Sequence, residues 1–193
     1  MAHHIYQSEG FVVAHNPRSE ADRSILIFTR ELGMIRAVAT GVRLGKSKLA
    51  GHLQEYSYGK FAFVKGRDVW RITDASAAIH ATSAIKAKRL HYEVYVRTLS
   101  VLKRLLSGEE PHPDLFDIVK NGVEYLPHAA DLLGTECLIM IRILHALGYV
   151  GDEASVQRFA GTEEFSDEMV TELLKDRANV IKAINGGLKE SHL

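Results

Sequence analysis

The spacing of apolar residues changes once along this 193-residue chain, and no other feature constrains the fold as strongly. Before about residue 78, β-branched and aromatic residues form short runs typical of strands. Beyond that point, apolar residues recur every three or four positions, as they do on one face of a helix. We therefore expect an α+β protein with two domains, residues 1–78 and residues 79–193.

The first domain is predicted to hold five strands. The candidate strands are residues 11–13, 25–28, 35–39, 56–64 and 69–73. Turn sequences separate several of them, and one helical turn is expected at Lys48-Leu49-Ala50 in the longer 41–55 segment. Three strands, a short helix and two strands is the order of an OB-fold β-barrel. Alternation places Phe61 and Phe63 in the core, whereas Trp70 is ambiguous, with core burial favoured.

The second domain is predicted to be a bundle of helices. Its first three helices are expected over residues 84–107, 114–126 and 130–147. The third is apolar nearly all round, so we expect it in the middle of the bundle. Residues 152–165 are predicted to be a connection, followed by helical turns from Ser166 that Gly186-Gly187 interrupts.

Charge divides the chain sharply although the net charge is zero. Residues 1–104 carry 17 Lys and Arg against 8 Asp and Glu, and residues 105–193 carry 7 against 16. A basic half of this kind is the electrostatic signature of a polyanion binder, because phosphate contacts release counterions. The alternative is a solvated basic surface without a ligand.

The sequence offers few candidates for catalysis or metal binding. The single cysteine, Cys137, lies in an apolar run and is most simply a core residue, and the histidines lack helical metal-ligand spacing. The segment from Gly41 to Ser47 resembles a P-loop, but it is one residue short. No cofactor is therefore expected. No long apolar stretch or signal-like N-terminus is present, which predicts a cytoplasmic protein without membrane attachment.

The same 41–47 segment is better interpreted as a basic loop that approaches phosphates. Further cations stand on the predicted strands, on the last hairpin and on the first long helix. The candidate nucleic-acid contacts are Arg36, Arg43, Lys46, Lys48, Lys65, Arg67, Arg71, Lys88 and Arg89.

Several segments have a characteristic order and spacing, namely residues 9–13, 19–22, 27–35, 39–43, 46–51, 53–54 and 67–75, and more weakly 113–117 and 143–149. Taken together, they resemble the bacterial RecO recombination mediator family. The resemblance implies an OB-fold followed by a helical domain, without enzymatic activity. It also implies binding to single- and double-stranded DNA, strand annealing, recombinase loading, and partnership with RecR and single-strand binding protein.

The chain departs from the family at one place. Many members carry a cysteine-rich zinc insert after the central helix, whereas residues 151–165 contain no cysteine, so this is a short form without that zinc site. In the family, the tail of single-strand binding protein docks on the helical domain through an apolar pocket and basic residues that receive its carboxylate. Arg142 is the candidate receiver. The alternative function is a non-catalytic adaptor whose basic barrel binds an acidic protein.

Overall fold

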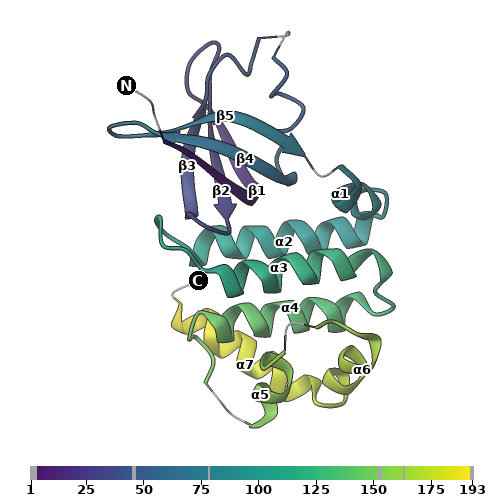
Figure 1. The fold of residues 1–193 in the computed structure, drawn as a ribbon. Helices are drawn as coiled ribbons and strands as arrows, with labels where there is room; N and C mark the ends of the chain where they lie inside the picture. The colour runs from purple at the N-terminus through teal and green to yellow at the C-terminus, as the bar shows by residue number, and fades with distance from the viewer. Residues whose placement is uncertain (1–3, 45–46, 78, 152–153, 163, 192–193) are drawn as a thin grey trace. The chain divides into compact units, whose positions relative to one another are not determined.

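The computed structural model describes residues 4–44, 47–77, 79–151, 154–162 and 164–191, and these form two compact units (Figure 1). The barrel unit comprises Met1–Ser83 and Leu106–His112, and the helical unit comprises Ala84–Leu105 and Pro113–Leu193. Each unit has its own cluster of buried apolar side chains. The boundary thus falls inside a helix, a few residues after the predicted position, and the barrel unit gains a second chain segment.

The barrel unit is a closed five-stranded barrel, as the sequence predicts. Its strands are β1 (Ile5–Pro17), β2 (Arg23–Thr29), β3 (Gly33–Ala39), β4 (Tyr58–Lys65) and β5 (Trp70–Ala77). They close in the order β1-β2-β3-β5-β4, and β1 pairs with both β2 and β4. A register shift between Val12 and Ala14 bends this long strand so that it can serve both neighbours.

Alternate residues of neighbouring strands form the barrel core. Ile25 and Ile27 on β2 and Ile35 and Ala37 on β3 are fully buried. Phe63 and Trp70 also lie in this core and meet edge to face at 6.3 Å, which confirms the interior position expected for Trp70. Between β3 and β4 the expected helical turn at residues 48–50 is wrong. Turns occupy that stretch, because its hydrogen bonds span three residues and are not continued.

Residues 106–112, here named the strap, lie against the barrel although they are distant from it in sequence. Only Ala37 and Val38 of β3 pair with β5, so the first half of β3 needs another partner on that side. The Met34 amide donates to the Gly108 carbonyl at 3.1 Å. Gly33 has φ +71°, and a Cβ there would lie 2.2 Å from the Glu110 carbonyl oxygen, so only glycine fits under the strap.

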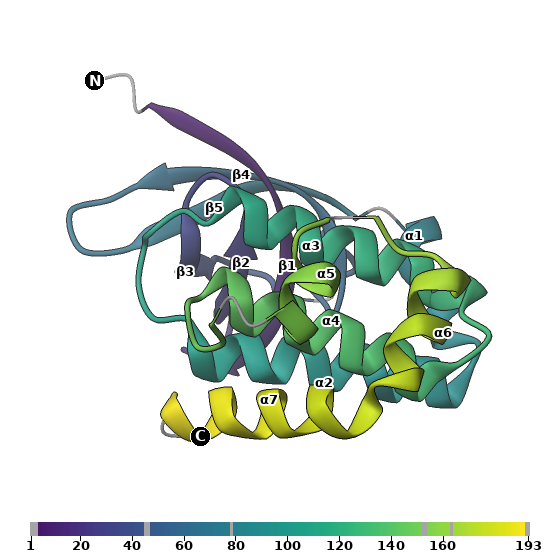
Figure 2. The same cartoon turned by 90° about the horizontal axis from the view of Figure 1, so that it is seen from below.

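The helical unit is built around one buried helix. Its elements are α1 (Ile79–Lys86, which the unit boundary crosses), α2 (Arg89–Leu105), α3 (Pro113–Tyr125), η1 (Leu126–His128), α4 (Leu132–Ala146), α5 (Ala154–Ala160), α6 (Asp167–Lys175) and α7 (Arg177–Glu190). Helix α4 contacts α2, α3, α5, α6 and α7, and Figures 1 and 2 show it between its neighbours. The expected central position of the third helix is confirmed.

Three details of the helical prediction are wrong. The first long helix is two, α1 and α2, separated at residues 87–88. The segment 152–165, expected to be a connection, contains α5. Its Val156 and Phe159 are three residues apart, so both lie on the face of α5 that packs in the helical core. Gly186 and Gly187 do not interrupt α7, which continues to Glu190.

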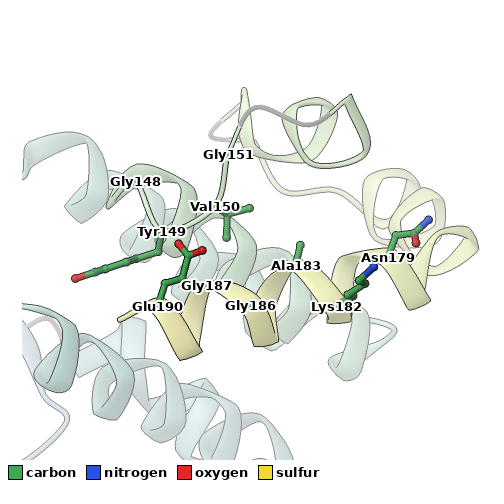
Figure 3. Close-up of a pocket in the computed structure, with 10 residues that line it drawn as sticks. All are labelled: Gly148, Tyr149, Val150, Gly151, Asn179, Lys182, Ala183, Gly186, Gly187 and Glu190. Carbon is green, nitrogen blue, oxygen red and sulfur yellow. The ribbon is translucent and has the colours of Figure 1, made fainter. Parts of the chain in front are cut away.

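Both glycines of α7 line one groove (Figure 3), but a Cβ at each position would meet different neighbours. A Cβ on Gly187 would lie 2.8 Å from Cγ2 of Val150 and 3.0 Å from the Tyr149 carbonyl oxygen. A Cβ on Gly186 would meet nothing within 4 Å, because that position faces a groove of about 700 Å³ between α7 and residues 148–151. Close packing therefore explains only the second glycine.

We predict opposite effects for alanine at these adjacent positions. Gly187→Ala should lower the free energy of unfolding by about 1–2 kcal/mol through overpacking against Val150. Gly186→Ala, the matched control, should raise it by about 0.5–1 kcal/mol through helix propensity alone. Urea unfolding followed by circular dichroism at 222 nm measures both, and equal effects would contradict the packing argument.

Candidate nucleic-acid interface

Two arginines stand together on the outer surface of the barrel. In β3, Arg36 is the only exposed residue, because its neighbours Ile35 and Ala37 point into the core. Arg71 on β5 lies opposite Val38 in parallel register, and Val38 is two residues beyond Arg36 on the same outward side. The spacings of a β-sheet then place the two arginine Cα atoms roughly 8 Å apart. Neither guanidinium has an ion pair or hydrogen bond with any residue that the structure describes.

The loop after β3 brings further cations to the same unit. Its start is held against the β1–β2 turn, since the Gly41 amide donates to Asp22 Oδ1 at 2.8 Å and the Arg43 amide donates to the Ala21 carbonyl at 2.9 Å. The exposed Arg43 side chain donates from Nη1 to the Ser19 carbonyl at 2.6 Å, which fixes its direction. Lys48 is exposed. Lys46, like Gly45 beside it, lies outside the described residues.

The last hairpin holds two exposed cations, Lys65 and Arg67, and Lys65 forms an ion pair. Lys65 Nζ lies 2.9 Å from Glu109 Oε2 on the strap and 4.9 Å from the centre of the Trp70 ring. The Trp70 indole N–H donates to the other oxygen of Glu109, Oε1, at 2.9 Å. These hydrogen bonds, from Lys65 and then Trp70, lower the pKa of Glu109 and keep it ionised. Arg67, in the turn between β4 and β5, is exposed.

The remaining two candidates belong to the helical unit. Lys88 donates from Nζ to the Pro127 carbonyl at 2.9 Å, and Arg89 forms an ion pair with Glu93 at 3.0 Å. Both residues are exposed at the start of α2. The structure therefore gathers the candidates of the barrel within one unit and assigns Lys88 and Arg89 to the other.

Arg142, the candidate receiver for a partner's carboxylate, is fully buried. Its Nε donates to the Phe159 carbonyl and its Nη2 to the Glu164 carbonyl, each at 2.8 Å. The guanidinium also lies over the Phe165 ring, 4.3 Å from its centre. These contacts tie α4 to α5 and to the segment that follows α5, and the side chain is not exposed to a ligand.

A surface groove of the helical unit escaped sequence reasoning. It has a volume of about 410 Å³, lies among α2, α4 and α7, and is mainly apolar. Leu133, Cys137 and Met140 of α4 contribute to it, and Arg97 and Arg104 of α2 stand in its lining. Arg97 is engaged by both carboxylate oxygens of Glu136, at 2.6 and 2.7 Å, whereas Arg104 is exposed. The sequence did hold a signal for it: the helix now assigned as α4 is apolar nearly all round, so its apolar residues exceed what one buried face requires.

Other kinds of site are not evident in the described part of the chain. Among these residues, no group of three or more His, Cys, Asp or Glu side chains could hold a metal ion. Burial raises the pKa of the Cys137 thiol, which disfavours the reactive thiolate. None of the described helices is both long enough and apolar enough to cross a bilayer.

Comparison with known proteins gives a consistent result. Residues 1–79 match the family model described as Recombination protein O N terminal. The chain is similar to DNA repair protein RecO of Alkaliphilus metalliredigens, at 33% identity over 60% of this chain and 46% of the relative. It is also similar to RecO of Alkalilimnicola ehrlichii (34% identity, 72% and 53%) and of Trichodesmium erythraeum (29% identity, 82% and 57%). The chain spans about half the length of the curated relatives it matches.

The contacts of Arg142 predict a structural role. Arg142→Met should lower the free energy of unfolding by about 2–4 kcal/mol, because two carbonyls lose a charged donor inside the core. Arg104→Met, an exposed arginine on α2, should change it by less than about 0.5 kcal/mol. Urea denaturation of both variants measures this difference. Unchanged stability of Arg142→Met would return Arg142 to the list of candidate ligand-binding residues.

Proposed function

Because this chain belongs to the RecO family through its N-terminal barrel, we propose that it is a non-catalytic mediator of DNA repair and homologous recombination in the bacterial cytoplasm. It binds single- and double-stranded DNA through the barrel and promotes annealing of complementary strands. With RecR and single-strand binding protein, it promotes recombinase loading. The observation that supports DNA binding best is the outward pair Arg36 and Arg71, whose guanidinium groups are not engaged by described residues.

The physical basis is phosphate neutralisation. Two DNA strands repel each other through their backbones, and a protein that contacts phosphates reduces this repulsion while it releases counterions. Arg36 and Arg71 lie close enough to contact neighbouring phosphates of one strand. Arg43 and Lys48 add cations from the loop after β3, and Arg67 adds one from the last hairpin. Such contacts position DNA without recognising its sequence.

We predict that Arg36→Ala combined with Arg71→Ala weakens binding to a labelled single-stranded oligonucleotide equally for different sequences. In a plot of log affinity against log salt concentration, the slope should become shallower by about 1.4, which corresponds to two lost phosphate contacts on a single strand. Fluorescence anisotropy at several salt concentrations measures both quantities.

The matched control removes the same charge from the helical unit. Lys182→Ala combined with Lys189→Ala changes two exposed lysines of α7 and should leave the slope unchanged. If the two double variants weaken binding equally, the loss of affinity reflects only the change in net charge and not a contact at Arg36 and Arg71. If the native protein does not bind the oligonucleotide even at low salt, the result would favour an adaptor whose barrel recognises an acidic protein.

We also propose that the groove among α2, α4 and α7 receives the tail of single-strand binding protein. The family resemblance requires an apolar pocket beside a basic residue, and the groove combines Leu133 and Met140 with Arg104. Arg104 replaces Arg142 in this proposal because Arg104 is exposed at the groove, whereas Arg142 is buried. The apolar walls contact side chains of the tail, and the guanidinium donates hydrogen bonds to its terminal carboxylate.

Two leucines allow a matched test of this groove. Leu133 and Leu90 are each the second residue of a helix, and their exposed fractions are 45% and 62%, but only Leu133 lines the groove. Leu133→Asn should weaken binding of a peptide from the C-terminus of single-strand binding protein by about fivefold or more. Leu90→Asn should leave it unchanged. Calorimetric titration gives both affinities, and equal values would exclude the groove as the docking site.

A further inference from the structure

The contact between the strap and the last hairpin has the chemistry of an anion site. One carboxylate, that of Glu109, takes an ion pair from Lys65 Nζ and a hydrogen bond from the Trp70 indole N–H, both at 2.9 Å. Lysine and an indole N–H are donors that a phosphate oxygen also accepts. The two donors lie on paired residues of β4 and β5, so the barrel itself fixes their separation.

This contact can be exchanged. The side chains of Lys65 and Glu109 are about half exposed, 54% and 48%, and an exposed ion pair contributes little to stability. Trp70 itself is anchored, because its ring is buried against Phe63 and Tyr6. If Glu109 moved away, the cation and the N–H would remain in place and open to another anion.

The strap can place the Glu109 carboxylate in competition with another anion for Lys65 and Trp70. It holds its position by backbone contacts that do not involve the Glu109 side chain, namely the Met34 to Gly108 hydrogen bond and the close approach of Glu110 to Gly33. The Glu109 carboxylate can therefore leave Lys65 while the strap stays on the barrel. Its neighbour Glu110 is also exposed but makes no ion pair with a described residue.

We infer that Lys65 and Trp70 form a phosphate subsite of the barrel and that Glu109 occupies this subsite when DNA is absent, as an autoinhibitory phosphate mimic. The inference rests on the DNA binding proposed above and adds a regulation of it. A DNA phosphate that enters the subsite replaces one anion with another, so both donors stay satisfied. The strap thus raises the concentration of DNA at which the barrel is filled.

The test compares two variants of the full chain that lose the same charge from the same strap. Glu109→Gln should bind a single-stranded oligonucleotide about threefold to tenfold more tightly than the native protein. Its salt slope should be steeper by about 0.7, because Lys65 then contacts a phosphate without exchanging an ion pair with Glu109. Glu110→Gln, the control, should change the affinity by less than about twofold. Adding Lys65→Ala to Glu109→Gln should abolish the gain.

Trp70 supplies an independent readout because it is the only tryptophan of the chain. Its emission should shift when the native protein is saturated with DNA, and Lys65→Ala should reduce that shift. This measurement does not require a substitution at Glu109. It therefore still tests the subsite if Glu109→Gln destabilises the barrel.

The outcomes separate the two proposals. If the native protein binds DNA, but Glu109→Gln and Glu110→Gln have equal affinities and the Trp70 emission does not shift, the phosphate subsite is excluded and DNA binding by the barrel stands. No binding by the native protein or any variant at low salt overturns the proposed function itself. A gain confined to Glu109→Gln that requires Lys65 supports the inference.

Discussion

A closed barrel must join the two edges of its sheet, and here that closure depends on the short parallel pairing of β3 with β5. Only Ala37 and Val38 of β3 pair with β5. An unpaired strand edge exposes amides and carbonyls that need partners, and the strap supplies one of them at Met34. Gly33 permits this close approach because its positive φ and missing side chain leave room for the Glu110 backbone. The arrangement of Lys65, Trp70 and Glu109 follows from the same closure.

Local sequence patterns predicted the barrel but not the strap that lies against its β3 edge. Runs of β-branched and aromatic residues identified five strands, and alternation placed Phe61 and Phe63 on one face of β4, which is buried. The partners of Glu109 are 44 and 39 residues away in the chain, and no periodicity reports contacts at such distances. The same limit applies to Gly187, which looked like a helix breaker but instead lies against Val150.

The candidate site was predicted in part. The outward direction of Arg36 and Arg71 follows from strand alternation, which is a local property. Arg142 was misleading because a charged residue in an apolar helix resembles a functional group, whereas its guanidinium joins two backbone carbonyls of the following segment. The groove with Leu133 and Arg104 depends on how three helices meet, so it required the structure.

The division of the barrel unit between two chain segments has a consequence for the order of folding during synthesis. Proteins generally fold from the N-terminus as the ribosome releases them. All five strands have emerged once Ala77 has been made, yet the residues that complete the β3 edge end at His112. Helix α2 lies between these points and belongs to the other unit. The nascent barrel therefore waits with part of one edge uncovered until α2 has been synthesised, and its maturation is coupled to the start of the helical unit.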